Sequence, residues 1–219
     1  MKKSAKKAFL LAGVFLFLFL LLTFLVMKVD VQPIGPQNSE VGLATINGAI
    51  FEVCGSNPLW YTISEALGIV ALLCIAGFGC LGAWQLISRK SLKKVDKSLF
   101  VLAGFYAVVA FVYVLFEVIV INYRPILEEG ILEASYPSSH TMLVCCIMLT
   151  TALQLQVRIR LKALRMGLQG ACLLIMVLTA IGRILAGVHW YTDVLAAILI
   201  SGVLVFAYLG TLRQLKIRK

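Results

Sequence analysis

Two histidines, two arginines and an aspartate stand near serines in three short polar segments of an otherwise apolar chain. The segments are residues 123–125, 136–141 and 182–193. Both histidines of the sequence, His140 and His189, belong to them. Ionisable residues are costly among apolar segments and usually mark a working site. We therefore expect these three segments to form the functional site.

Arg124 and Arg183 suit the recognition of a phosphate group. A guanidinium can donate two parallel hydrogen bonds to phosphate oxygens and can stabilise their charge during transfer. Ser138 and Ser139 lead directly into an apolar stretch, so they can offer hydroxyls and backbone amides at a helix N-terminus, a common anion site. These four residues predict a phosphate-binding cradle.

The histidines suit the transfer of that phosphate. One imidazole can attack phosphorus while the other protonates the leaving oxygen. His189 and Asp193 are four residues apart, so they are neighbours on one face if a helix begins there. A carboxylate on one imidazole nitrogen fixes the tautomer and leaves the other nitrogen free to attack.

The composition places this site in a membrane protein. Of the 219 residues, 61% are hydrophobic and only 14% are charged, a surface that a soluble domain could not solvate. A helix needs about 20 apolar residues to cross the hydrocarbon. We expect an all-α, polytopic protein in which residues 1–219 form a single six-helix membrane domain. The expected spans are 8–27, 66–87, 99–123, 141–157, 168–188 and 194–212.

The net charge of +10 is explained by topology. Of the 20 Lys and Arg residues, 17 fall at alternate span ends, in the N-terminal run and in residues 89–97, 158–165 and 213–219. The positive-inside rule then predicts a multi-pass protein of the cell membrane with both termini in the cytoplasm and the polar segments on the outer face. Some attraction to anionic lipid headgroups follows, and we expect no nucleic-acid partner.

The remaining outer chain is a loop over residues 28–65, followed later by the motif-bearing region 124–193. An amphipathic stretch over 41–51, with Trp60 and Tyr61 near the next span, is typical of a helix lying in the membrane interface. This helix is either a lid or lipid-entry ramp, or a simple connection.

Neither a metal nor another cofactor is expected. The sequence has no Cys, His and carboxylate cluster with metal-ligand spacing. Five of the six cysteines fall inside expected spans and only Cys54 lies in the outer loop, so we interpret them as small apolar packing residues.

The three segments resemble the motifs of the type 2 phosphatidic acid phosphatase superfamily, which includes bacterial membrane lipid phosphatases and vanadium haloperoxidases. The family pattern is Lys-x6-Arg-Pro, Pro-Ser-Gly-His and Ser-Arg-x5-His-x3-Asp. The matching residues, in order and spacing, are Arg124-Pro125, Pro137-Ser138 with His140, and Arg183-x5-His189-x3-Asp193.

This resemblance implies a role for each matching residue. His189 would form a phosphohistidine, Asp193 would orient it, and His140 would be the general acid. The residues that would hold the phosphate are Arg124, Arg183 and Ser138.

The sequence departs from the family pattern at three positions. Ser139 replaces Gly, Gly182 replaces Ser, and Glu117 stands where the family has lysine. A carboxylate there would repel phosphate unless it were neutral or paired. Two helical turns would place Glu117 on the same face as Arg124, roughly 10 Å deeper. Our hypothesis is that Glu117 pairs with an active-site arginine and positions it.

Three functions remain open from the sequence. The first is hydrolysis of a lipid phosphomonoester or diphosphate, of the undecaprenyl diphosphate, phosphatidylglycerol phosphate or phosphatidic acid type. The second is phosphotransfer, in which an acceptor hydroxyl replaces water. The third, suggested by Glu117, is a non-catalytic protein that binds lipid.

Overall fold

The computed structural model describes residues 2–128 and 130–215, and in this part of the chain the regular structure is helical. Six helices are long and apolar enough to cross a membrane, which confirms the expected all-α, multi-span class. The six are α1 (Lys2–Lys28), α3 (Pro58–Arg89), α4 (Lys97–Val118), α5 (Ser139–Arg158), α6 (Lys162–Leu185) and α7 (Tyr191–Gln214). The shorter elements are α2 (Ala44–Cys54) and the 3₁₀ turns η1 (Pro36–Asn38) and η2 (Leu92–Lys94).

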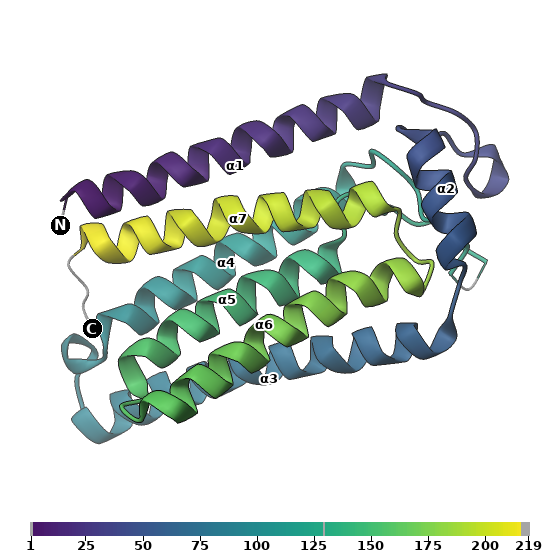
Figure 1. Cartoon of the computed structure of the whole chain (residues 1–219). Coiled ribbons are helices and arrows are strands. Elements are labelled where there is room, and N and C mark those ends of the chain that lie inside the picture. The colour runs from purple at the N-terminus through teal and green to yellow at the C-terminus, as the bar shows by residue number, and fades with distance from the viewer. Residues whose placement is uncertain (1, 129, 216–219) are drawn as a thin grey trace.

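The long helices lie side by side, and α2 covers one end of the bundle (Figure 1). α1 packs along α7, while α5 contacts α3, α4, α6 and α7 and is the most deeply buried span. α5 is also the least apolar span. Its polar side chains are satisfied inside the bundle, as when Gln154 Nε2 donates to the Tyr208 hydroxyl over 2.6 Å. Internal pairing of this kind makes burial of polar groups tolerable.

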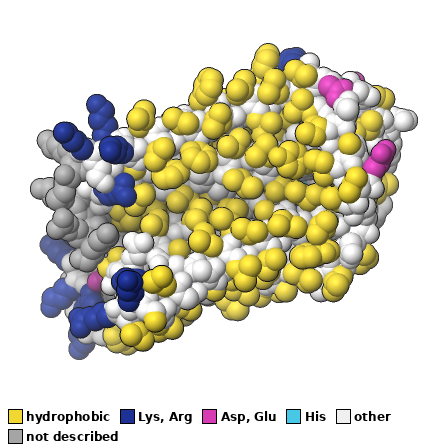
Figure 2. Space-filling model, viewed as in Figure 1, with side chains coloured by type: hydrophobic (Ala, Val, Ile, Leu, Met, Phe, Trp, Pro, Cys, Tyr) yellow, Lys and Arg dark blue, Asp and Glu magenta, His cyan; other side chains and the backbone are white. Residues whose placement is uncertain are grey.

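Charge is segregated between the two ends of the bundle. Lys and Arg gather at one end, and an apolar belt covers the middle (Figure 2). The start of α1 and the end of α7 meet at this basic end, where Arg213 Nη1 donates to the Ser4 carbonyl over 3.1 Å. The last basic residues, Lys216, Arg218 and Lys219, lie outside the described part of the chain. The three motif segments lie at the opposite end, where α5 and α7 begin and α6 ends.

Helix α3 begins at Pro58 and not at the expected residue 66. The Asn57 side chain accepts a hydrogen bond of 2.9 Å from the Leu59 amide, and Pro58 occupies the first helical position. Both features are favourable at a helix start. The expected outer loop is therefore shorter, and Tyr61 and Glu65 stand on α3.

Helix α4 ends at Val118 and not at the expected residue 123. The chain beyond it is extended, with an antiparallel bridge between Tyr123 and Ala134 and a hydrogen bond of 3.0 Å from the Arg124 amide to the Glu133 carbonyl. Glu117 and Arg124 are thus not on one helical face.

The outer segment before α3 carries α2, which overlaps the expected helical stretch 41–51 and extends three residues beyond it. The side chain of Asn47 on α2 is buried and bonds to the start of α7. It donates to Thr192 Oγ1 over 2.9 Å and accepts from the Thr192 amide over 3.2 Å. Phe51 also packs on Trp190. α2 therefore braces the turn that presents His189.

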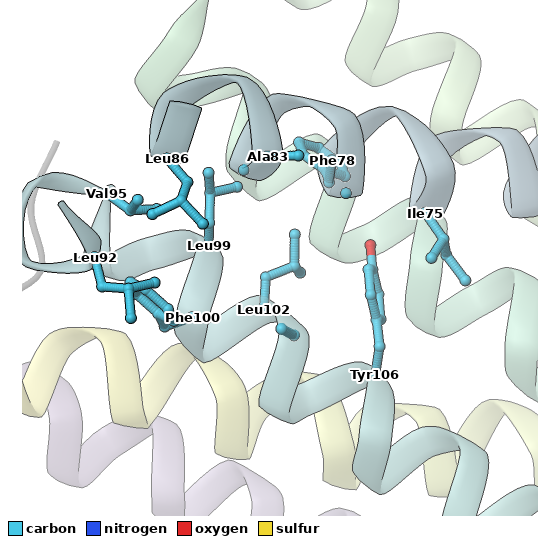
Figure 3. Close-up of a pocket in the computed structure, with 13 residues that line it drawn as sticks. Ile75, Phe78, Ala83, Leu86, Leu92, Val95, Leu99, Phe100, Leu102 and Tyr106 are labelled. Carbon is cyan, nitrogen blue, oxygen red and sulfur yellow. The ribbon is translucent and has the colours of Figure 1, made fainter. Parts of the chain in front are cut away.

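An apolar groove of about 450 Å³ separates the basic-end halves of α3 and α4 (Figure 3). Leu86 and Phe78 line it from α3, and Leu99, Leu102 and Tyr106 from α4. Among the residues that the structure describes, no histidine or charged side chain lines this groove. It is not a candidate for the phosphate chemistry.

Candidate active site

A cavity of about 250 Å³ lies at the end of the bundle opposite the basic end. Among its lining residues are six of the eight expected site residues: Glu117, Arg124, Ser139, His140, Arg183 and His189. They come from α4, the loop after it, the first turn of α5, the end of α6 and the loop before α7. Ser138 and Asp193 are fully buried and do not line the cavity.

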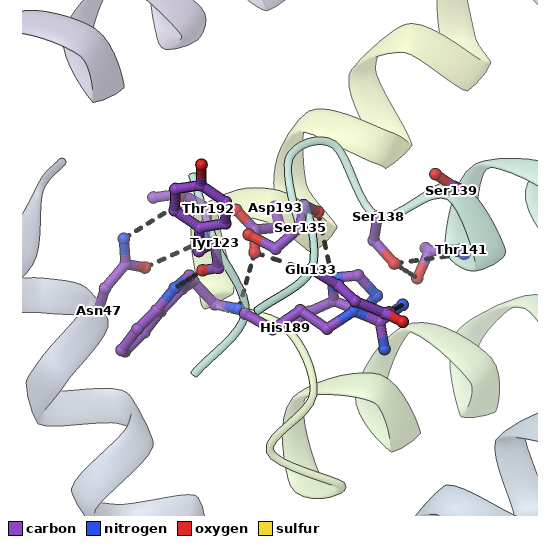
Figure 4. Close-up of polar contacts among 12 residues, drawn as sticks. Asn47, Tyr123, Glu133, Ser135, Ser138, Ser139, Thr141, His189, Thr192 and Asp193 are labelled. Carbon is purple, nitrogen blue, oxygen red and sulfur yellow. Dashed lines mark hydrogen bonds and ion pairs between the residues drawn. The ribbon is translucent and has the colours of Figure 1, made fainter. Parts of the chain in front are cut away.

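His189 is held in one tautomer by the backbone. Its Nδ1 lies 3.1 Å from the Ser135 carbonyl oxygen (Figure 4). A carbonyl can only accept, so Nδ1 carries the proton and Nε2 keeps its lone pair. Burial lowers the pKa of His189 well below its usual range, and the positive charges of Arg183 and Arg124 act in the same direction. The imidazole is therefore neutral and suited to attack through Nε2.

The loop before His189 needs a glycine at Gly187. This residue has φ +70°, and an added Cβ would lie 2.8 Å from the Gly55 carbonyl oxygen. A side chain at this position would be strained and would push the loop away from the segment before α3.

Asp193 lies beside His189, as its spacing predicts, but does not bond to it. Its Oδ2 is 3.8 Å from His189 Nδ1 and accepts a hydrogen bond of 2.9 Å from the Trp190 amide (Figure 4). Asp193 thus fixes the start of α7 and places its carboxyl group near the ring. The Ser135 carbonyl, which the sequence does not reveal, fixes the tautomer.

Arg183 is almost fully buried at the end of α6, with 3% of its surface exposed. Its Nη1 donates to Glu65 Oε1 over 2.6 Å, and its guanidinium lies over the Tyr61 ring at 5.5 Å. Its Nε is buried and has no hydrogen-bond partner among the described residues.

Arg124, which lines the same cavity, is also paired with carboxylates. Nη1 pairs with Glu128, and Nη2 lies 3.2 Å from Glu133 Oε2. Its Nε is also buried without a partner in the part of the chain that the structure describes. An unpaired buried N–H is costly. Each guanidinium therefore retains one unsatisfied N–H donor.

His140 stands on the first turn of α5 and packs against α3. Its Nε2 lies 3.0 Å from the Ser64 carbonyl oxygen, so Nε2 carries a proton. The ring lies against Gly68, where an added Cβ would come within 2.4 Å of Cε1. His140 Nδ1 lies 3.7 Å from Glu65 Oε1.

Ser138 caps α5 and does not line the cavity. Its hydroxyl accepts from the Thr141 amide at 3.4 Å and donates to Thr141 Oγ1 at 2.9 Å (Figure 4). A phosphate contact by this hydroxyl remains a prediction.

Comparison with known families agrees with the motif resemblance. A family model described as the PAP2 superfamily matches residues 100–216. The chain belongs to this superfamily. A solved structure of a transmembrane PAP2-type phosphatidylglycerolphosphate phosphatase from Bacillus subtilis is 19% identical, with a TM-score of 0.64. That match covers 95% of this chain and 98% of the other and shows a shared fold. No curated protein matches the sequence.

Two of the three departures from the PAP2 pattern contact each other. Ser139 Oγ donates a hydrogen bond of 3.0 Å to Glu117 Oε1. The expected pairing of Glu117 with an arginine is wrong for the described residues, in which Arg124 and Arg183 pair with Glu128, Glu133 and Glu65. The reason is that α4 ends at Val118, so Glu117 and Arg124 do not share a helical face.

The third departure, Gly182, brings α6 close to α3. A Cβ at this position would lie 3.3 Å from Ser64 Cβ and 3.4 Å from the Trp60 ring. These distances are tighter than most real contacts, so a serine would press the helices apart. Glycine here allows α3 to approach Arg183.

Glu65 is a site residue that the sequence analysis missed. It lines the cavity and contacts both Arg183 and His140. The Asn57-Pro58 pair is a helix-start signal that could have placed Glu65 two turns into α3, at the level of the motifs.

No group of three or more His, Cys, Asp or Glu side chains suited to a metal ion occurs within residues 2–128 and 130–215. Metal independence stays a prediction. The arrangement offers a neutral imidazole, a second imidazole and two buried guanidinium donors around one cavity.

Proposed function

We propose that this PAP2 protein hydrolyses a phosphomonoester or diphosphate of a membrane lipid through a phosphohistidine on His189. The observation that carries the proposal is the pair of buried Nε donors of Arg124 and Arg183, both left without an acceptor among the described residues. These side chains line one cavity with His189 and His140. A phosphate group bound there would accept from both donors.

In the first step, His189 Nε2 attacks phosphorus as its Nδ1–H stays bonded to the Ser135 carbonyl. The bond between phosphorus and the leaving oxygen breaks, and a protonated His140 gives its proton to that oxygen. The two guanidiniums stabilise charge on the equatorial oxygens. The nearby Asp193 carboxylate offsets the positive charge that develops on the ring.

In the second step, water attacks the phosphorus of the phosphohistidine. His140, now neutral, takes a proton from the water, and the bond between phosphorus and Nε2 breaks. The products are inorganic phosphate and the original enzyme. An acceptor hydroxyl in place of water would turn the same sequence into phosphotransfer.

A lipid substrate is supported by the bundle itself, because the chain has six apolar spans and four of them, α3, α4, α5 and α6, line a cavity at one end. We propose that this end is the outer face of the cell membrane and that both termini are cytoplasmic. The concentration of Lys and Arg at the other end supports this orientation (Figure 2).

The test is phosphate release from a panel of detergent-solubilised lipid phosphates and diphosphates. We expect release by the wild-type protein and by Glu52→Gln, an exposed carboxylate of α2 outside the cavity. His189→Ala should lose activity by at least about 10⁴-fold, because the one other histidine, His140, is held by the Ser64 carbonyl and serves as the general acid.

Adding a lipid or sugar alcohol to the assay separates transfer from hydrolysis. A non-catalytic lipid-binding role would show itself if inorganic phosphate bound to the wild-type protein but no substrate in the panel released phosphate. That result would indicate that the carboxylates paired with both arginines prevent catalysis.

A further inference from the structure

The first three turns of α3 form one wall of the active site. Three residues of this wall contact His140: Ser64 through its backbone carbonyl, Glu65 through its carboxylate, and Gly68 through its Cα, which carries no side chain. This helix lies outside the residues 100–216 that match the PAP2 family model. The wall is therefore a feature of this chain that its family motifs do not describe.

One carboxylate oxygen of this wall contacts two site residues. Glu65 Oε1 lies 2.6 Å from Arg183 Nη1 and 3.7 Å from His140 Nδ1. We propose that Glu65 is a positioning residue that favours the protonated form of His140, the proton donor to the leaving group, and anchors the guanidinium of Arg183. The inference rests on the proposed function, in which His140 is the general acid.

The anchoring of Arg183 by Glu65 follows from the hydrogen bonds of the guanidinium. Its side chain is buried, with 4% exposed, whereas the Glu65 carboxylate is 44% exposed and reaches in from the rim. Because Glu65 occupies Nη1, the guanidinium cannot rotate freely. Its unpaired Nε is thereby held in place in a side chain that lines the cavity.

The effect of Glu65 on the protonation of His140 follows from the contacts of the two ring nitrogens. Nε2–H is committed to the Ser64 carbonyl, so the transferable proton is on Nδ1. When Nδ1 is protonated, the nearest carboxylate is Glu65, whose negative charge favours the imidazolium. Arg183 and Arg124 line the same cavity and oppose protonation, so this support is needed.

The other groups around His140 set the background for any pH effect. They are Tyr61 of α3, Tyr113 and Glu117 of α4, Arg183 of α6, and Arg124, Glu128 and His189 of the loops. Glu117 is engaged by Ser139, the neighbour of His140. Among these groups, Glu65 is the carboxylate with a direct contact to the ring.

The decisive variant is Glu65→Gln, which preserves shape and removes charge. Glu65→Asp keeps the charge on a shorter arm, and Glu52→Gln is the control for removal of an exposed carboxylate at the same end. With an alkyl lipid phosphate, we expect Glu65→Gln to lower kcat by about 10²-fold, because the leaving oxygen then lacks its proton donor. KM should change little, because two effects oppose each other. Weaker anchoring of Arg183 reduces phosphate binding, and loss of the carboxylate removes a charge that repels the phosphate.

Two further readouts separate this role from a structural one. With an aryl phosphate, whose leaving group needs no proton, kcat should fall less than about threefold. With the alkyl substrate, the alkaline limb of the pH profile should move by about one pH unit to lower pH. Glu65→Asp should recover part of kcat on the alkyl substrate. Equal losses on both substrates with an unmoved limb would overturn the proposal.

A measurement without turnover keeps this proposal separate from the proposed function. The chain has two histidines, so ¹⁵N-histidine NMR in detergent, with His189→Gln as the assignment variant, gives the His140 titration directly. In Glu65→Gln the midpoint should fall by about one pH unit, and in Glu52→Gln it should not move. An unchanged midpoint in Glu65→Gln refutes the role of Glu65 even if the enzyme is active. A shifted midpoint supports it even if no lipid is hydrolysed.

Discussion

Ser139 Oγ donates a hydrogen bond of 3.0 Å to Glu117 Oε1, so two positions at which this site departs from the PAP2 pattern are in contact. The pattern has glycine and lysine at these positions. A glycine has no hydroxyl group that could donate this hydrogen bond, and the ammonium group of a lysine could not accept it. The two departures therefore depend on each other, and neither alone should be reversed without cost.

Reversing both departures should strengthen phosphate binding. In Glu117→Lys with Ser139→Gly, a cation replaces the carboxylate and the hydroxyl that bonded to it is removed. We expect inorganic phosphate to bind about tenfold more tightly, as a new charge-assisted hydrogen bond would give. Calorimetry on the detergent-solubilised protein measures this. Unchanged or weaker binding in the double variant would show that Glu117 does not face the phosphate.

Gly68→Ala should disable His140 while leaving the fold intact. The added Cβ would meet the imidazole at 2.4 Å, so the ring must leave the Ser64 carbonyl. We expect kcat for an alkyl lipid phosphate to fall about 10²-fold. Gly77→Ala is the matched control on the same helix, since nothing lies within 4 Å of its Cβ. Similar activity of the two variants would contradict the packing of His140 on α3.

Ser138→Ala should act on stability. The buried hydroxyl caps α5 through Thr141, and its loss should cost about 1 kcal/mol. Thermal unfolding in detergent is the measurement, with Ser91→Ala as control because the Ser91 side chain makes no capping bond. A loss of phosphate affinity with unchanged stability would instead support the phosphate contact that the motif implies.

His189 should remain neutral at mildly acidic pH. Its pKa is lowered, so protonation of Nε2 requires a pH well below the ordinary value of 6.5. The nucleophile is thus available on the acid side of neutrality. ¹⁵N NMR of the histidines, with His140→Gln for assignment, should show an Nδ1–H neutral ring at about pH 6. A midpoint near 6.5 would mean that the ring is more solvated than the structure indicates.

The sequence predicted the spans and the meeting of the motifs because both depend on strong local signals. Long apolar runs fix the six helices, and the motif segments fall at span ends on one side. His140, Arg183 and His189 consequently line one cavity, as expected. Charge alternation along the chain likewise matches the basic end of the bundle (Figure 2).

The errors concern helix ends, where one or two residues decide the outcome. α3 begins at Pro58 because Asn57 caps it, which places Glu65 in the site. α4 ends at Val118, which removes Glu117 from Arg124. The acceptors for the two histidines, the carbonyls of Ser64 and Ser135, are backbone atoms, which sequence motifs cannot identify.

The most direct test of the account is to trap the phosphorylated enzyme. A ³²P-labelled lipid phosphate is mixed with the protein, and the reaction is quenched in alkali, in which phosphohistidine survives. We predict label on wild-type protein, more label on His140→Ala with a good leaving group because hydrolysis of the intermediate is slowed, and none on His189→Ala. Label or turnover that persists in His189→Ala would contradict the phosphohistidine mechanism.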